Sequence, residues 1–265
     1  MRWQQWEITQ MLRITRTIGS YLASFLSKPR PGYQQHDTTS VDAILQVIKP
    51  GDILLVDGNS RISTAIKYLT QSTWSHACLY MGAPDATVES LTLVEADLNN
   101  GVTMVPLNKY ADYNVRICRP VGLNAAERKE LLNFVQERIG FRYDLKNIFD
   151  LMRYLIQNPA VPTQYRRDML SLGSGEPTKA ICSTLIAQAF QSINYPILPR
   201  SSLDEGSDEQ LFEARHHTHY VPRDFDLSPY FCVVKPTLEL GFDFHALRWS
   251  EPQEQTETGE LAQHQ

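Results

Sequence analysis

A histidine on an apolar strand, a carboxylate on the following strand and a cysteine at a helix start are the parts of a thiol nucleophile. In this chain these residues are His76, Glu95 and Cys182. The cysteine would attack, the imidazole would take the thiol proton, and the carboxylate would fix the imidazole tautomer. Two of these residues have a plainer interpretation. His76 could be a core histidine whose ring nitrogens are hydrogen-bonded, and Cys182 could be a buried core cysteine. Their combination favours catalysis.

Alternating apolar residues define which face of the sheet these side chains share. His76, Cys78 and Tyr80 alternate with apolar neighbours, so they point to one face of a predicted strand. Glu95 and Asp97 share a face of the next predicted strand, after a turn at 82–85. If the two strands pair in antiparallel fashion, we expect Glu95 beside His76.

The position of Cys182 favours a reactive thiolate. A free thiol has a pKa near 8.5, and a helix N-terminus or a neighbouring imidazolium lowers it. Residues 181–193 predict a helix that opens at Cys182. We predict that the remaining cysteines, Cys78, Cys118 and Cys232, are buried small hydrophobes in strand-like stretches.

Acyl transfer also requires donors for the oxyanion. Backbone N–H groups at the helix start, those of Cys182 and Ser183, are predicted to supply them. Tyr80, on the face of His76, and Tyr143 are candidates for a hydroxyl that assists or contacts substrate.

Several short segments, in this order along the chain, resemble the circularly permuted, NlpC-type papain-like cysteine hydrolases, and within them the YiiX/YaeF-like branch. They are Gly51-Asp52-Ile53-Leu54-Leu55, Trp74-Ser75-His76, Val94-Glu95-Ala96, Tyr143-Asp144 and Ile181-Cys182-Ser183. The resemblance covers roughly residues 45–240. It implies Cys182 as nucleophile, His76 as base and Glu95 as orienting residue, and acyltransferases related to lecithin:retinol acyltransferase are more distant cousins.

The expected fold is α+β: a permuted papain-like antiparallel sheet packed against the helix that carries the nucleophilic cysteine. We predict an N-terminal amphipathic helix in 1–32, a linker in 33–42, the hydrolase domain in 43–249 and a disordered acidic tail in 250–265. The first of these packs on its own domain or a partner chain, or rests on an anionic membrane. Residues 157–179 are either a lid or wall of the cleft or an inert insertion.

Composition narrows the classes of partner and compartment. The net charge is -5 and the chain is 42% hydrophobic, with no domain-scale basic stripe, which argues against nucleic acid. Four cysteines form no CxxC pair, and a free Cys182 would leave three, so a reducing, cytoplasmic compartment is predicted. Membrane association through residues 1–26 is left open.

We predict no cofactor and no metal site. The run His216-His217-Thr218-His219 lacks the cysteine or carboxylate that would complete a tetrahedral zinc site. It is interpreted as a solvated polar loop.

Three functions remain open. The first is a cysteine hydrolase that cleaves an amide or ester through an acyl-enzyme. The resemblance implies a peptide, peptidoglycan-fragment or lipid-acyl substrate for it. The second is a lipid-directed acyltransferase or thioesterase, separated from the first by the acceptor of the acyl group. The third is a non-catalytic binding module on the same fold.

Overall fold

The computed structural model describes residues 24–25, 27–29, 32–36, 39–82, 89–97, 100–141, 181–203, 210–213 and 215–248. The N-terminal helix, the insertion at 157–179 and the acidic tail, all predicted from sequence, lie wholly or largely outside these residues. The strands are β1 (Ile53–Val56), β2 (His76–Tyr80), β3 (Leu91–Asp97), β4 (Gly101–Pro106), β5 (Val115–Pro120), β6 (Arg200–Leu203), β7 (Gln210–Glu213) and β8 (Phe231–Val234).

The helical elements surround this framework. They are α2 (Val41–Val47), α3 (Arg61–Thr70), η1 (Leu107–Tyr110), α4 (Ala125–Gln136), α7 (Ile181–Ser192), η2 (His217–His219), α8 (Pro222–Leu227), α9 (Pro236–Glu239) and η3 (Phe244–Ala246).

One antiparallel sheet organises the fold. Its six strands run in the order β4-β3-β2-β1-β5-β8, and every neighbouring pair is antiparallel. Strands β6 and β7 form a separate two-stranded sheet. With helices packed against an antiparallel sheet, the α+β class expected from the sequence is confirmed.

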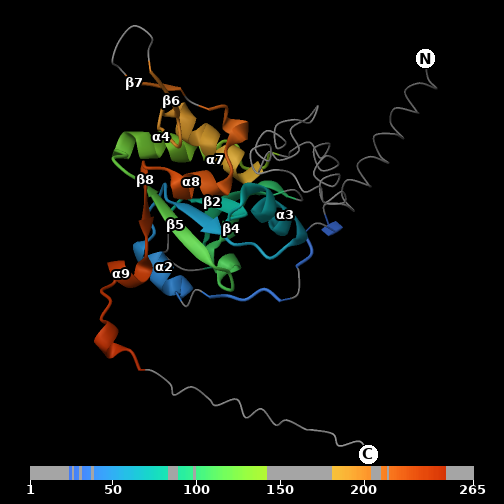
Figure 1. Cartoon of the computed structure of the whole chain (residues 1–265), viewed down its shortest axis with the longest axis vertical. Helices are drawn as coiled ribbons and strands as arrows, with labels where there is room; N and C mark the ends of the chain where they lie inside the picture. Colours follow the sequence, from blue (N-terminus) through green and yellow to red (C-terminus); the bar gives the residue numbers. More distant parts are fainter. Residues whose placement is uncertain are drawn as a thin grey trace, which may run out of the picture.

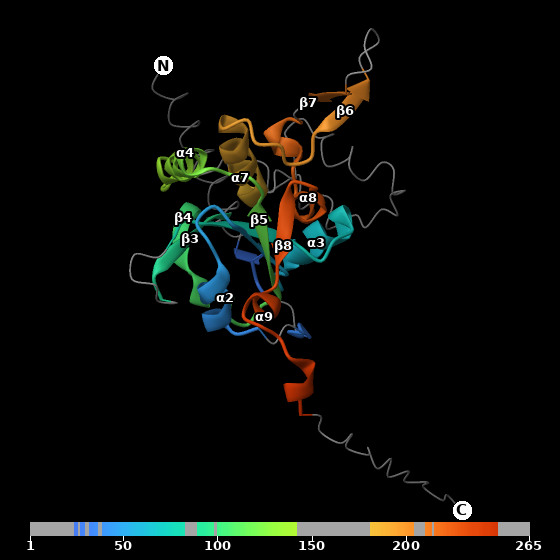
Figure 2. The same cartoon turned by 90° about the vertical axis from the view of Figure 1, so that its left-hand side faces the viewer.

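The helices cover the two faces of the large sheet (Figures 1 and 2). Helices α4 and α7 lie on one side, and α2 lies on the other. Alternation along β2 divides its side chains accordingly: Ala77 and Leu79 join the core under α7, whereas Cys78 and Tyr80 join the core under α2. The helix that carries Cys182 therefore packs on the sheet, as the sequence predicted.

Local sequence signals explain the boundaries of several helices. Asn124 caps α4 by accepting hydrogen bonds from the N–H groups of Ala126 and Glu127, and Glu127 completes a capping box. Gln71 ends α3 in the left-handed conformation, at φ 52°.

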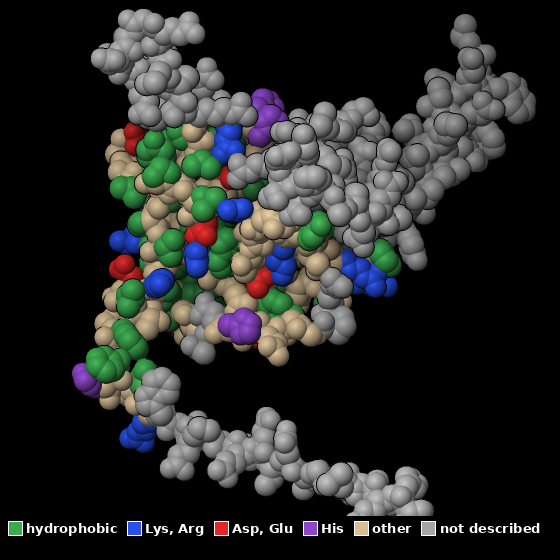
Figure 3. Space-filling model, in the orientation of Figure 1, with side chains coloured by type: hydrophobic (Ala, Val, Ile, Leu, Met, Phe, Trp, Pro, Cys, Tyr) green, Lys and Arg blue, Asp and Glu red, His purple; other side chains and the backbone are tan. Residues whose placement is uncertain are grey.

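The chain beyond β8 exposes large apolar side chains. These side chains are between 47% and 62% exposed and can be followed on the lower left of Figure 3: Leu238, Leu240, Phe242, Phe244 and Leu247. Among the described residues, no helix is long and apolar enough to cross a membrane.

Candidate active site

His76 is the first residue of β2, at the point where β2 and β3 separate. Strands β2 and β3 are paired at Leu79–Val94 and Tyr80–Leu93. Continuing that register would set Cys78 opposite Glu95, with His76 one diagonal step away on the same face. Accordingly, His76 Nε2 lies 3.1 Å from Glu95 Oε2. The predicted neighbourhood of His76 and Glu95 is therefore present in the structure.

Asp97, the other carboxylate on this face, is engaged elsewhere. It accepts hydrogen bonds from the backbone N–H of Asn100 at 2.6 Å and from the Asn100 side chain at 3.0 Å. These bonds close the turn between β3 and β4. Glu95 is thus the carboxylate that orients His76.

Cys182 lies in the first turn of α7 and is 5% exposed. Burial alone raises the pKa of its thiol. The charge of His76, a hydrogen bond with His76 and backbone N–H bonds from Ala77 and Ser183 outweigh burial and lower that pKa below its ordinary value. These contacts bring Cys182 and His76 together, although they are 106 residues apart in the chain.

His76 takes the complementary protonation state. Burial lowers its pKa, but the electrostatic interactions and hydrogen bonds with Cys78 and Cys182 raise it well above 6.5. Since Nε2 faces Glu95, Nδ1 is the nitrogen left to exchange a proton with Cys182. The opposite shifts of Cys182 and His76 favour a thiolate–imidazolium pair.

Glu95 is held ionised by three partners. Burial raises its pKa, but the hydrogen bond and charge of His76, together with Lys109, lower it to about 2. Lys109 Nζ pairs with Oε1 of Glu95, and the Tyr110 hydroxyl donates to Oε2. With its side chain only 1% exposed, Glu95 stays charged inside the sheet because these partners replace water.

Lys109 and Tyr110 were missed by the sequence analysis. Both lie in η1, which directly follows β4, the hairpin partner of the strand that carries Glu95. A Lys-Tyr pair in a polar turn is too common to indicate a site. The only available signal was their proximity in sequence to the end of that hairpin.

Cys78 is buried in the core as predicted. Its polar neighbours were not predicted: its Sγ lies 3.9 Å from Glu95 Oε2 and 3.4 Å from the Tyr110 hydroxyl. Burial raises the pKa of the Cys78 thiol, although His76 acts in the opposite direction. The site therefore contains a second sulfur.

The other two cysteines differ from each other. Cys118 is buried as predicted, and burial raises its pKa to about 12. Cys232, predicted to be buried, is exposed on the edge strand β8. The neighbouring Val233 is exposed as well, between the buried Phe231 and Val234, and sequence could not say that β8 would be the edge strand.

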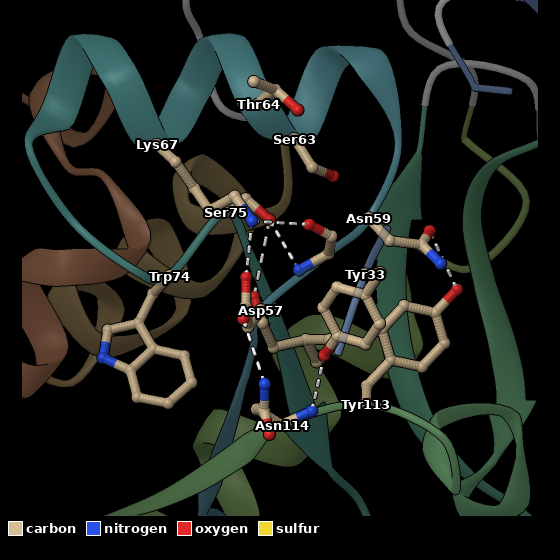
Figure 4. Close-up of polar contacts among 12 residues, drawn as sticks. Tyr33, Asp57, Asn59, Ser63, Thr64, Lys67, Trp74, Ser75, Tyr113 and Asn114 are labelled. Atoms are coloured by element: carbon tan, nitrogen blue, oxygen red, sulfur yellow. Dashed lines mark hydrogen bonds and ion pairs between the residues drawn. The ribbon is translucent and has the colours of Figure 1, made fainter. Parts of the chain in front are cut away.

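A polar cluster secures the start of β2 (Figure 4). Ser75, directly before His76, accepts a hydrogen bond from the Gly58 N–H at 2.9 Å. Asp57 is bound by Lys67 at 2.6 Å and by the Asn114 side chain at 3.2 Å. Because these bonds tie β1, α3 and β5 to the residue before His76, they fix the position from which the imidazole projects.

The residues predicted to assist the oxyanion or contact substrate differ in where the structure places them. Ser183 contributes a backbone N–H to the Cys182 sulfur, while its hydroxyl donates to the carbonyl of Tyr220 at 2.8 Å. Tyr80 is buried in the core at the far end of β2, about 13 Å along the strand from His76, so the structure does not bring it to the imidazole. Tyr143 lies outside the described residues.

The histidine run forms a short turn. His217–His219 is the 3-10 helix η2, and His216 Nδ1 lies 2.7 Å from the Thr218 hydroxyl.

A different group of side chains has the donor types of a metal site. One donor atom each from His76, Cys78 and Glu95 lies within 4.8 Å of the others.

A cavity of about 590 Å³ lies beside α7 and is lined by Val102, Phe134, Arg138, Phe141, Leu185, Gln188, Gln191 and Ser192. Cys182 and His76 are not among these residues, so we do not assign this cavity as the substrate-binding site of the reaction.

Comparison with known proteins gives three results. Residues 47–154 match the family of permuted papain-like amidase enzymes YaeF/YiiX, the C92 family. The matched stretch contains His76 and Glu95 and ends before Cys182. The crystal structure of the metalloprotein yiiX from Escherichia coli O157:H7 is similar with 16% sequence identity and a TM-score of 0.43, covering 71% of this chain and 96% of that one. No curated protein matches the chain.

Proposed function

We propose that this chain cleaves an amide or ester bond through an acyl-enzyme on Cys182, and the match of residues 47–154 to the permuted papain-like amidase enzymes supports this proposal. The observation that carries this proposal is the set of contacts at one imidazole. His76 meets the Cys182 sulfur on one side and Glu95 on the other. Nucleophile, base and orienting group therefore occur in the order that thiol catalysis needs.

In the first half-reaction, the Cys182 thiolate attacks the substrate carbonyl carbon and the carbonyl π electrons move to oxygen. The Ser183 N–H, which donates to the Cys182 thiolate before attack, and the N–H of Cys182 can donate to that oxyanion once the sulfur has lost its charge. The tetrahedral intermediate collapses, the bond to the leaving amine or alcohol breaks, and protonated His76 gives its proton to that group. The product is a thioester on Cys182.

In the second half-reaction, neutral His76 takes a proton from water as the water attacks the thioester carbonyl. The carboxylic acid leaves and the thiolate–imidazolium pair is restored. Glu95 keeps the imidazole oriented throughout, while Lys109 and Tyr110 hold Glu95 in place. We assign these two residues positioning roles, because they act through Glu95.

The experiment is incubation of the full chain with a library of acyl esters and amides, followed by intact mass measurement. We expect an acyl adduct that maps to Cys182 and is absent from Cys182→Ala. Peptide, peptidoglycan-fragment and lipid-acyl members of the library test the substrate classes that the resemblance implies.

The same experiment separates the other candidate functions. Free acid as product supports hydrolysis, whereas transfer to an added alcohol or amine in preference to water would support an acyltransferase. If no acyl donor modifies Cys182 in the folded protein, the acyl-enzyme proposal is wrong and the binding module takes its place.

A further inference from the structure

The proposed reaction uses one thiol, but the site contains two. Cys78 is completely buried on the same strand face as His76, and its sulfur points to Glu95 and Tyr110. An alanine or valine would fill an apolar core position without placing a polarizable, ionisable sulfur beside a carboxylate. Cys78 therefore requires a role that the reaction does not supply.

The donor atoms around Cys78 have the spacing of metal ligands. His76 Nε2 lies 3.1 Å from Glu95 Oε2, Cys78 Sγ lies 3.9 Å from the same oxygen, and the donors of the three residues all lie within 4.8 Å of one another. Tetrahedral zinc, with bonds near 2.0 Å to N and O and 2.3 Å to S, separates its ligands by about 3.3 to 3.6 Å. Shifts of a few tenths of an ångström would bring the two measured separations to that range.

We propose that His76, Cys78 and Glu95 form a binding site for a thiophilic divalent cation of the zinc type. The combination of sulfur, imidazole nitrogen and carboxylate oxygen favours Zn²⁺ over Mg²⁺ or Ca²⁺, which prefer oxygen ligands alone. Three protein ligands leave one coordination position open. Lys109 pairs with Oε1 of Glu95, so Oε2, the oxygen nearest His76 and Cys78, is the donor, and it accepts the hydrogen bond of the Tyr110 hydroxyl as well.

The cation would switch the site off. Nε2 of His76 would bond the metal instead of Glu95, and the carboxylate would bond the metal as well. A metal-bound imidazole cannot cycle between acid and base at Nδ1 as the reaction with Cys182 requires, because the cation withdraws electron density from the ring. Zinc is therefore an inhibitor whose binding depends on Cys78. This inhibitory role rests on the proposed function, whereas metal binding itself does not.

Binding is tested without any enzyme activity. The full chain carrying Cys182→Ser and Cys232→Ser, which removes the nucleophile and the exposed thiol, is treated with chelator and titrated with Cd²⁺. We expect one equivalent to bind with an ultraviolet thiolate-to-cadmium charge-transfer band. Adding Cys78→Ser should abolish the band, and adding Glu95→Gln should weaken Cd²⁺ affinity at least tenfold.

Two further measurements separate loss of binding from misfolding. Circular dichroism checks that each variant is folded. Calorimetry with Zn²⁺ repeats the titration in the Glu95→Gln variant, which retains both the Cys78 sulfur and the His76 imidazole. Cys118→Ser in the same background is the matched control, since Cys118 is equally buried but lies on the other core of the sheet. A band that survives Cys78→Ser, or that Cys118→Ser removes, overturns the site.

Inhibition is tested by acylation of Cys182 in the otherwise unmodified chain. Zn²⁺ should slow it, and in Cys78→Ser the rate with Zn²⁺ should equal the rate of the same variant without metal. Slowing that persists in Cys78→Ser means that zinc binds Cys182 and His76 directly, and acceleration by Zn²⁺ contradicts an inhibitory role. Cadmium binding without any acylation would defeat the proposed function alone; acylation without cadmium binding would defeat the metal site alone.

Discussion

At the scale of single residues, the chemistry depends on which charges face one imidazole. Cys182 and Cys78 both contact His76, yet the pKa of Cys182 falls and that of Cys78 rises. The difference lies in their other neighbours. Cys182 receives N–H donors from Ala77 and Ser183, whereas Cys78 faces the negative charge of Glu95.

This difference predicts selective alkylation in chelator-treated protein. At pH 6 to 7, iodoacetamide should modify Cys182 faster than Cys78 or Cys118, as measured by peptide mass mapping. His76→Ala should slow Cys182 labelling by about tenfold or more at these pH values, since each unit of thiol pKa changes the thiolate fraction tenfold. Glu95→Gln should have a smaller effect, because Glu95 orients the ring without accepting the thiol proton.

Cys232 is the control for accessibility in this experiment, because it is exposed and distant in sequence from the site. If Cys182 labels no faster than the buried Cys78 and Cys118, or if His76→Ala leaves its rate unchanged, the nucleophile is misassigned.

Glu95 predicts a pH dependence of stability. Its folded pKa of about 2 lies below the ordinary 4.5, so its contribution is present above pH 4.5 and disappears as pH falls through 2. At 1.36 kcal/mol per unit, that contribution is about 3 kcal/mol. Denaturant unfolding of the metal-free protein between pH 5 and 2 should show a steeper loss than unfolding of Glu95→Gln. Equal slopes would mean that Glu95 is not held ionised by its neighbours.

At the scale of elements, the site depends on a tight approach between β1, α3 and the start of β2. Gly58 follows β1, and a Cβ added there would lie 2.4 Å from the Ser63 hydroxyl and 2.8 Å from the Ser75 hydroxyl. Glycine is required because the two side chains already occupy that space.

Gly58→Ala should therefore destabilise the fold by about 1 to 3 kcal/mol through overpacking. It should also slow acylation of Cys182, because Ser75 precedes His76. The measurements are urea unfolding and adduct formation. Adding Ser63→Ala removes the nearest obstructing atom and should restore part of both losses. No recovery in the double variant would place the strain elsewhere.

At the scale of the whole molecule, the region preceding the sheet is tied to it from residue 28 onward. Pro29 forms a bridge with Ser60, and the Arg61 N–H donates to the carbonyl of Lys28 at 3.2 Å. Further along, His36 N–H donates to the Asn114 side chain at 2.7 Å. The end of the predicted segment 1–32 thus contacts the start of α3, and the predicted linker, 33–42, contacts Asn114 directly before β5.

These contacts predict where truncation becomes harmful. Deleting residues 1–26 should leave turnover of a water-soluble substrate within a few-fold, and deleting residues 1–36 should lower Tm by several degrees, because the bonds to Asn114 and Ser60 are lost. Thermal unfolding and acylation rates check both. A folded but inactive 27–265 chain would place the N-terminal segment in the active domain.

The amino-acid sequence by itself predicted several of the elements and the residues that we propose to react. Period-two alternation placed His76 on one defined face of its strand, and helical periodicity over residues 181–193 placed Cys182 at the start of α7. These signals are local, because they depend on residues a few positions apart and on backbone geometry.

Only the tertiary structure decided which groups meet. Sequence could not reveal that the fold brings the Cys78 sulfur to 3.9 Å from Glu95 Oε2, beyond the paired residues of β2 and β3. Nor could it show that Lys109 and Tyr110 fold back onto that carboxylate, or that the Ala77 N–H reaches the Cys182 sulfur. A buried charge is stabilised by whatever donors surround it in space, and chain separation carries no information about those donors.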